Sequence, residues 1–248
     1  MITLKSPHEI ETMKKGGAML HEALIYAQEV AQVGMTTNTL NKLIEERIEA
    51  LGGEPGFKRV KGYHWGTCIC INEQIVHTPP SERVIADGDV VTIDAGVYYG
   101  GLHTDSAVTL QVGTQEPAAT QFLDTGKKAL KKALSVAYVG NRIGHISQAF
   151  QETIEAGGYS IVKELTGHGV GHELHEDPYI PCFLDREISK TKELRPGMTL
   201  ALEVMYAQGK PKIATDRDGW SISVVDKSIT ATFEHSIALS ENGTLILT

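Results

Sequence analysis

The sequence lacks the features of a secreted, membrane-spanning or nucleic-acid-binding protein. Its 248 residues contain no apolar run near the roughly 18 residues that a membrane-spanning helix needs. The N-terminal segment has no apolar stretch of the kind found in signal peptides. There is no long basic run, and the formal net charge is −8, which disfavours an anionic membrane or a nucleic acid as the main partner. The cytoplasm is therefore the expected compartment.

Cysteine is scarce, at three residues: Cys68, Cys70 and Cys182. An odd number in a long chain does not form a disulfide framework. The Cys-x-Cys spacing is also too short for the usual C-x2-C metal knuckle. Because Cys68 and Cys70 alternate with Ile69 and Ile71, we interpret them as one face of a strand.

The chain does contain an internal repeat. Residues 23–52 and 129–158 align without a gap and are identical at 12 of 30 positions, more than chance composition gives. Each copy has the pattern of a helix, a glycine-containing turn and a second helix that ends at a glycine. The first helix is expected to begin near Ser6 and Pro7. Two unrelated amphipathic helices are the alternative interpretation.

A β-rich tract follows each helical pair. Alternation of apolar and polar residues predicts strands at 68–77, 90–98, 105–112, 160–165, 198–207, 220–225, 230–240 and 245–247. The predicted fold class is therefore α+β, in which helices pack on antiparallel sheet. We expect one domain over residues 1–248, with two similar halves at about 1–113 and 114–248. A site shared by the halves would lie in the cleft between them.

Two aspartates flank a predicted hairpin. Asp94 lies on the opposite face of its strand from Val91 and Ile93, and the segment 99–101 is a turn signal. A turn centred on positions 99 and 100 would place Asp94 directly opposite Asp105. Two carboxylates at that separation repel unless a cation or a proton lies between them. Solvated surface aspartates are the alternative, which the apolar flanks of Asp94 disfavour.

Two glutamates are embedded in apolar strands. Glu203 lies between Leu202 and Val204, and Glu234 follows Phe233. Charged side chains are rarely buried unless they are paired or bound to a metal. From these residues alone, a metal site and an ordinary salt-bridge partner for each glutamate both remain open.

Histidines gather at the glycine-rich segment 167–178. His168, His172 and His175 lie within eight residues, beside glycines that let the backbone approach another group closely. Their spacing is not the H-E-x-x-H pattern of helical zinc proteases. His77, at the end of the strand 68–77, fits a structural role as well as a functional one.

The strongest candidates are four carboxylates and one imidazole, namely Asp94, Asp105, Glu203, Glu234 and His168. This oxygen-rich set suits a pair of divalent first-row ions better than a structural zinc. Two ions about 3.5–4 Å apart can deprotonate a bridging water and polarise a carbonyl group.

At these residues the chain resembles type I methionine aminopeptidases of peptidase family M24, over essentially its whole length. Five ordered motifs carry the resemblance: residues 68–77, the pair Asp94 and Asp105, residues 167–176, residues 195–203 and residues 218–235. It implies the pita-bread fold, with two pseudo-symmetric halves and helices packed on a curved antiparallel sheet. The chain departs from the family pattern in the loop 55–68, at Thr78 and at Val204, none of which is a candidate ligand.

The resemblance also implies a role for each matching residue. One divalent ion would be held by Asp94, Asp105 and Glu234. The other would be held by Asp105, His168, Glu203 and Glu234. Cobalt, manganese, iron and zinc all fit such a site. Glu203 would also act as general acid and base on the attacking water, while His77 and His175 hydrogen-bond the scissile peptide. The apolar pocket for the methionine side chain would be lined by Tyr63, Cys68 and Trp220, with Phe57 and Trp65 nearby.

The function implied is removal of the N-terminal methionine from nascent proteins whose second residue is small, through a metal-activated water. The partners would be nascent polypeptide N-termini near the ribosome. The protein would be a monomer and would have no specific nucleic acid partner and no membrane partner. Two alternatives stay open: a proline-directed aminopeptidase of the same family, and a non-catalytic pita-bread binding protein. All five candidate ligands are present, which disfavours the second alternative.

Overall fold

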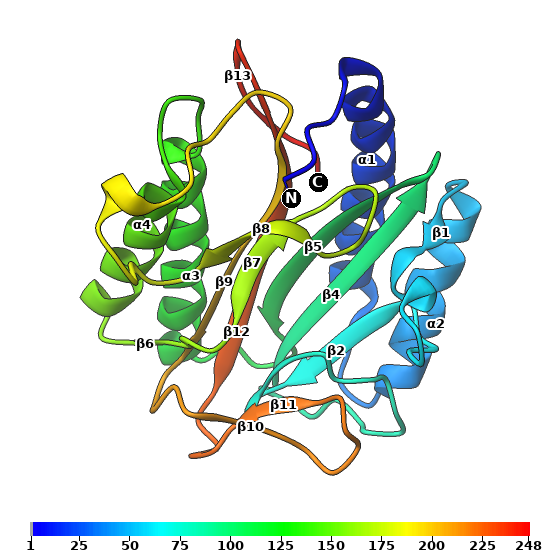
Figure 1. The fold of residues 1–248 in the computed structure, drawn as a ribbon. Coiled ribbons are helices and arrows are strands. Elements are labelled where there is room, and N and C mark those ends of the chain that lie inside the picture. Colours follow the sequence, from blue (N-terminus) through cyan, green and yellow to red (C-terminus); the bar gives the residue numbers. More distant parts are fainter. Residues whose placement is uncertain (1) are drawn as a thin grey trace.

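The computed structural model describes residues 2–248. Within that range the chain forms four long helices and three antiparallel sheets (Figure 1). The helices are α1 (Pro7–Val30), α2 (Thr37–Ala50), α3 (Pro117–Val136) and α4 (Ile143–Ala156). Two short 3-10 helices are η1 (Gly56–Arg59) and η2 (Ile188–Lys190). No helix of residues 2–248 is long and apolar enough to cross a membrane.

Two larger sheets lie side by side in the middle of the molecule (Figure 1). The first contains β1 (Glu54–Pro55), β2 (Thr67–Ile71), β4 (Val90–Tyr99) and β5 (Leu102–Gln111). The second contains β6 (Ser160–Ile161), β7 (Thr166–Gly169), β8 (Glu176–Pro181), β9 (Thr199–Ala207), β12 (Thr230–Ser240) and β13 (Gly243–Ile246). A small third sheet contains β3 (Gln74–Val76), β10 (Ile213–Thr215) and β11 (Ile222–Val224).

The helices follow the internal repeat. Helix α2 begins and ends 106 positions before α4, and α1 ends 106 positions before α3. The Ser6 side chain caps α1 with the following Pro7 in the first turn, as the sequence predicts. Figure 1 shows α1 and α2 on one outer side of the sheets and α3 and α4 on the other. The predicted α+β class, with helices packed on antiparallel sheet, is confirmed.

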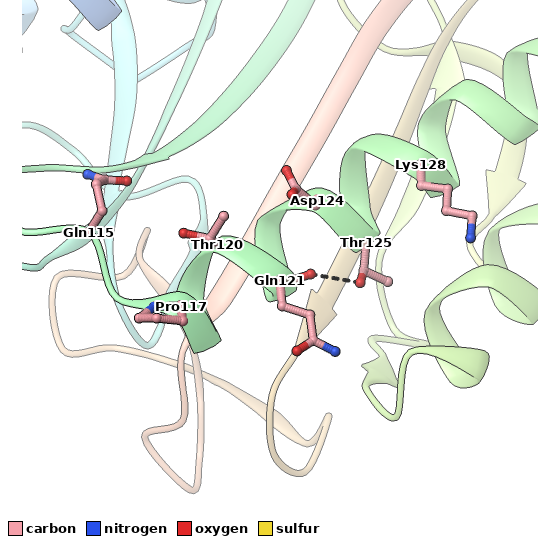
Figure 2. Close-up of a pocket in the computed structure, with 7 residues that line it drawn as sticks. All are labelled: Gln115, Pro117, Thr120, Gln121, Asp124, Thr125 and Lys128. Atoms are coloured by element: carbon pink, nitrogen blue, oxygen red, sulfur yellow. Dashed lines mark hydrogen bonds between the residues drawn. The ribbon is translucent and has the colours of Figure 1, made fainter.

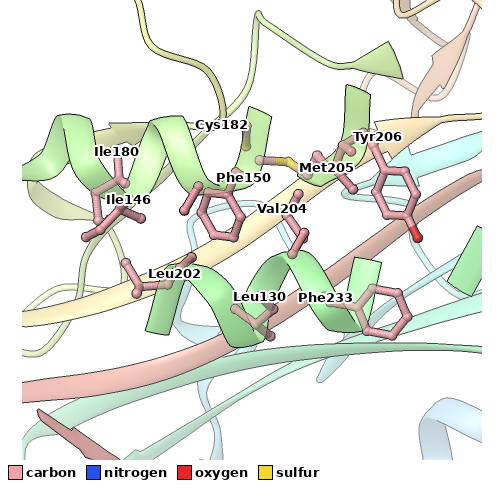
Figure 3. Close-up of a cluster of buried hydrophobic side chains, with 14 of the residues drawn as sticks. Leu130, Ile146, Phe150, Ile180, Cys182, Leu202, Val204, Met205, Tyr206 and Phe233 are labelled. Carbon is pink, nitrogen blue, oxygen red and sulfur yellow. The ribbon is translucent and has the colours of Figure 1, made fainter. Parts of the chain in front are cut away.

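Each helical pair buries its apolar face against one sheet. The first core joins α1 and α2 to Val91, Ile93 and Val97 of β4, which is the face predicted from alternation. Figure 3 shows the second core, in which α3 and α4 meet β9 and β12. Burial of each such large side chain contributes about 1.5–3 kcal/mol. Both cores lie on the helical sides of the sheets, so the opposite sides are free to form a site.

Two strand predictions were wrong in ways that matter for the site. The predicted strand 68–77 is two strands, β2 and β3, because Asn72 turns the chain with a φ of 56°. The glycine-rich segment 167–178, for which no strand was predicted, contains strand β7, which is paired with both β8 and β9. Glycine is required there because a Cβ at Gly169 would lie 2.3 Å from the Asp177 carbonyl oxygen.

The predicted register of the β4–β5 hairpin was also wrong. Tyr99 pairs with Leu102, so the turn consists of Gly100 and Gly101, both with positive φ. Two such residues form the tight hairpin turn that matches strand twist. Asp94 therefore lies opposite Ala107 rather than Asp105. The shift is two positions in the partner strand, which preserves the face, so Asp94 and Asp105 still project to the same side.

Hydroxyl groups join the two large sheets along β5 and β12. The Ser106 hydroxyl donates to the Glu234 carbonyl at 2.7 Å, and the Thr109 hydroxyl donates to the Thr232 carbonyl at 2.6 Å. Ser236 Oγ accepts from the Asp105 N–H at 2.9 Å and donates to the Asp105 carbonyl at 2.8 Å. We call these contacts the hydroxyl seam. It holds Asp105 of one half beside Glu234 of the other.

Replacement of Ser236 by alanine is expected to destabilise the protein by about 1–3 kcal/mol, because it leaves the buried Asp105 N–H and carbonyl without their partner. Urea unfolding monitored by circular dichroism measures the loss. Ser135→Ala is the matched control, since Ser135 is exposed on α3. Equal stability of the two variants would contradict a structural role for the hydroxyl seam.

Candidate metal centre and substrate pocket

Two glutamates face each other at the centre of the second sheet. Glu203 of β9 pairs directly with Glu234 of β12. Both residues are buried, Glu203 at 9% and Glu234 at 4% exposure. Like charges directly opposite each other on a sheet are destabilising, so this pair needs a proton or a cation between its carboxylates.

Two aspartates and a histidine complete the cluster. The carboxyl groups of Asp94 and Asp105 lie close enough to influence each other's pKa. Asp105, His168 and Glu234 offer ligand atoms that all lie within 4.8 Å of one another. His168 Nε2 is 3.8 Å from Asp105 Oδ2 and 3.6 Å from Glu203 Oε1. The structure therefore brings all five predicted ligands together, from β4, β5, β7, β9 and β12.

Unpartnered oxygens show that the cluster fits divalent cations. Asp94 Oδ1, Asp105 Oδ1 and Glu234 Oε1 are buried and accept no hydrogen bond among the described residues. Buried polar atoms are nearly always paired, and charged ones must be paired or coordinate a metal. Four carboxylates with one imidazole are also the donor set that divalent first-row ions accept.

Burial raises the pKa of all four carboxyl groups, and repulsion between neighbouring carboxylates raises that of three of them further. Burial raises the pKa of Asp94 to about 7. The pKa values of Asp105, Glu203 and Glu234 are well above their usual range, first through burial and then through repulsion from neighbouring carboxylates. Without cations the cluster therefore retains protons near neutral pH, and a bound cation displaces them.

His168 is held in the tautomer that suits a metal ligand. Its Nδ1 lies 2.9 Å from the Gly169 carbonyl oxygen, which can only accept, so Nδ1 carries the proton. Nε2 keeps its lone pair and faces the carboxylates. Burial lowers the pKa of His168 to about 3, so the imidazole stays neutral at physiological pH. Orientation of a ligand histidine by a backbone carbonyl is common at metal sites.

The carboxylate cluster opens into a cavity of about 120 Å³ with an apolar wall. Tyr63 contacts Trp220 with ring centroids 5.1 Å apart, and its hydroxyl lies 3.2 Å from Cys68 Sγ. Phe57 and Leu174 pack in the same buried cluster, with Val60 and Trp65 at its edge. The predicted pocket residues Tyr63, Cys68 and Trp220 thus share one cavity with the predicted ligands.

Two histidines line the cavity where it reaches solvent. His77 and His175 are both exposed. His77 has a φ of 60°, a left-handed conformation that is uncommon for a residue other than glycine. The ring of His175 lies 4.3 Å from the ring of His168. Both imidazoles can therefore reach a group that is bound between the ligands and solvent.

Sequence reasoning missed several wall residues, namely Val60, Val76 and Leu174. Val76 lies at the end of β3, and its place at the cavity depends on the break between β2 and β3, which the sequence did not predict. Leu174 could have been found, since it is the one apolar residue among His172, Glu173 and His175. Trp65 was expected to lie near the pocket and packs at the edge of the same cluster.

A larger hollow lies over the start of α3 and lacks comparable chemistry (Figure 2). Its volume is about 490 Å³, but its ionisable lining groups are Asp124 and Lys128 only. The Thr125 hydroxyl donates to a backbone carbonyl of its own helix. The small cavity at the carboxylate cluster is therefore the better candidate for an active site.

Comparison with known proteins identifies the class. The sequence model of the family described as "Metallopeptidase family M24" matches residues 11–241. The chain belongs to this family.

Its curated relatives include methionine aminopeptidases. That of Clostridium perfringens is 37% identical over 248 residues, which cover all of this chain and 99% of the relative. That of Bacillus subtilis is 38% identical over 251 residues, which cover all of this chain and 99% of the relative. Within the family the chain groups with the methionine aminopeptidases.

Solved structures agree with this grouping. Methionine aminopeptidase from Thermotoga maritima superposes with a TM-score of 0.96 at 39% identity, covering all of this chain and 99% of that one. Prolidase from Pyrococcus furiosus gives a TM-score of 0.78 at 23% identity, covering 99% of this chain and 65% of that one. The second likeness shows the shared fold alone.

Proposed function

We propose that this protein is a methionine aminopeptidase, which hydrolyses the first peptide bond of protein N-termini whose second residue is small. The observation that carries the proposal is a single cavity lined by four carboxylates, a neutral imidazole and an apolar aromatic wall. The grouping with methionine aminopeptidases supports this reaction over the proline-directed one.

The carboxylate cluster would hold two divalent ions. One would be bound by Asp94, Asp105 and Glu234. The other would be bound by Asp105, His168, Glu203 and Glu234. Cobalt, manganese, iron or zinc would satisfy these donors. When bound, such ions lower the pKa of water and polarise a carbonyl group.

The protein's own groups would handle the proton and the peptide. Glu203 would take the proton of the attacking water and return it to the departing amine. Its carboxylate supports this role by position, because it lines the cavity beside His168 and within the cluster of candidate ligands. His77 and His175, on the solvent side of the cavity, would hydrogen-bond the scissile peptide and stabilise the charge that develops on it.

The apolar wall would bind the methionine side chain. Tyr63, Cys68 and Trp220 offer aromatic faces and a thiol. A flexible thioether packs favourably against aromatic rings. The cavity of about 120 Å³ is small, so one residue of a substrate would enter it while the rest of the chain lies outside.

The setting would be that of a monomeric cytoplasmic hydrolase. Its substrates would be nascent polypeptide N-termini close to the ribosome, without a specific nucleic acid or membrane partner. The net charge of −8 supports the last point.

A peptide panel tests the activity. Metal-loaded protein is incubated with peptides that begin Met-Ala, Met-Pro and Ala-Pro, and the released amino acid is quantified. We expect Met-Ala to be cleaved at least about tenfold faster than Ala-Pro, because only methionine fills the apolar pocket. Faster cleavage of Ala-Pro would favour the proline-directed alternative. No cleavage of any peptide by metal-loaded protein would favour a binding protein.

A further inference from the structure

An ion pair is buried behind the loop that carries His175. The Lys5 ammonium donates to Glu176 Oε2, and the two side chains are 1% and 8% exposed. Lys5 lies in the segment before α1, whereas Glu176 begins β8. The pair therefore joins the start of the chain to a segment in the second half, next to the candidate active site.

Glu176 lies at the base of the loop 170–175. Its Oε1 accepts the Glu173 N–H at 3.0 Å, and its backbone pairs with Gly169 of β7. His168 directly precedes Gly169, and His175 directly precedes Glu176. The carboxylate of Glu176 thus closes the loop on itself between the two histidines.

Lys5 also fits closely against the loop backbone. A Cβ at Gly171 would lie 2.2 Å from Lys5 Cε. The Lys5 N–H donates to the Gly197 carbonyl at 2.7 Å, which fixes the lysine backbone beside the chain that leads into β9. A second, more exposed contact joins Glu9 of α1 to His172 at 2.7 Å.

Removal of one partner of a buried ion pair leaves an unpaired charge, which is strongly unfavourable. Without Lys5, the one remaining basic group beside Glu176 among the described ion pairs is the exposed His172 imidazole, whose Nδ1 lies 3.9 Å from Oε1, so Glu176 would have to reach water, take up a proton or turn toward His172. Each of these changes breaks the closure of the loop, and His175 moves with it. A displacement of about 1 Å at a reacting centre can reduce a rate about a hundredfold.

We propose that Lys5 is a positioning residue, which neutralises Glu176 and thereby fixes the His175 loop in its catalytic geometry. The proposal rests on the proposed function for its effect on turnover. Its effect on the loop stands on the contacts alone, so the two can be tested separately.

The experiment compares wild-type protein with K5M, E176Q and the double variant K5M/E176Q. Lys42→Met is the control, because it removes a lysine from an exposed ion pair with Glu46. Hydrogen exchange of the amides in 170–176 reports the loop without any substrate. The kcat and KM for a Met-Ala-Ser peptide are measured on manganese-loaded protein, and thermal midpoints report global folding.

Each single variant is expected to lose exchange protection in 170–176 and to lower kcat by about 10- to 100-fold, the range found for groups that orient active-site residues. KM should change less. The double variant has no unpaired buried charge, so it should recover about tenfold in kcat and most of the protection. Lys42→Met should match wild type.

Two results would overturn the proposal. One is normal exchange protection in 170–176 for both single variants. The other is a double variant whose loop is no better protected than that of the worse single variant. If K5M does not fold, the exchange protection of 170–176 in E176Q is compared with that in the wild type and in the double variant, and the same two results would overturn the proposal. Absence of methionine release by wild-type protein would instead count against the proposed function, while the exchange results still decide the role of Lys5.

Discussion

Glu203→Gln is expected to lower kcat for a Met-Ala-Ser peptide by about 10²–10⁴-fold, the usual contribution of a general acid and base. Glutamine is nearly isosteric, but it can neither hold a transferable proton nor supply a negative charge to a cation. Initial rates with saturating manganese measure the loss. The metal affinity of the variant, measured by calorimetry, should fall as well.

The same substitution should stabilise the metal-free protein. Glu203 faces Glu234 directly, and its charge adds to burial in raising the pKa of that carboxyl. A neutral amide removes this repulsion, so the thermal midpoint in the presence of a chelator should rise. Glu29→Gln, on the exposed face of α1, is the matched control. Near-normal turnover by the Glu203 variant would contradict the proposed mechanism.

Removal of metal is expected to make stability fall as pH rises above about 7. Asp105, Glu203 and Glu234 have pKa values raised well above those of the unfolded chain. A group with a raised carboxyl pKa contributes stability that is lost as pH rises through its folded pKa. Each carboxyl that still holds its proton adds a slope of about 1.4 kcal/mol per pH unit. Bound cations replace those protons, so the loaded protein should show little slope.

The choice of pH range matters because the histidines change the free energy of unfolding with pH in the opposite direction to the carboxyl groups. Burial lowers the pKa of His168 to about 3 and that of His103 to about 4. These groups stay neutral in the folded protein while the unfolded chain takes up protons, so they make stability rise with pH below about 6.5. Above about 7 the histidines are neutral in both states, and the carboxyl groups set the slope until about pH 8. Nearer pH 8.5 the buried thiols of Cys70 and Cys182, whose pKa burial raises to about 12, add the same downward slope with and without metal.

Urea unfolding between about pH 7 and 8.5, with chelator and with manganese, measures the effect. We expect the stability gap between loaded and metal-free protein to widen with pH. If the unfolding free energies of the loaded and the metal-free protein changed equally with pH, the carboxyl groups would not hold protons in the metal-free protein. A metal-free protein that gains stability over this range would contradict the burial argument for the cluster.

The sequence predicted which carboxyl groups gather in one cavity because each of the four lies in a strand with an alternating pattern, whereas His168 lies on β7, which alternation did not predict. Glu203 and Glu234 stand out as charges among apolar neighbours, and their burial is confirmed. Asp94 and Asp105 were assigned to the correct face although the register was shifted. Period-two alternation fixes the face of a strand, whereas the register depends on the turn. Here the turn is the pair Gly100 and Gly101.

The rest of the site depends on contacts between distant segments, which alternation does not report. Nothing near Lys5 indicates that its partner is Glu176, 171 positions later. The hydroxyl seam pairs Asp105 with Ser236, which are 131 positions apart. Such contacts follow from how the two halves pack. The individual roles of the site residues, such as His77 and His175, stay predictions.

The distribution of the five proposed ligands along the chain has a consequence for biosynthesis. Asp94 and Asp105 belong to residues 1–113, whereas His168, Glu203 and Glu234 belong to residues 114–248. Neither portion carries the full set of ligands, and the last of them lies on β12. A partly translated chain therefore lacks a complete centre. If these five residues are the ligands, hydrolytic capacity would arise only after the final strands emerge and dock along the hydroxyl seam, and a growing chain would not cleave its neighbours before β12 is made.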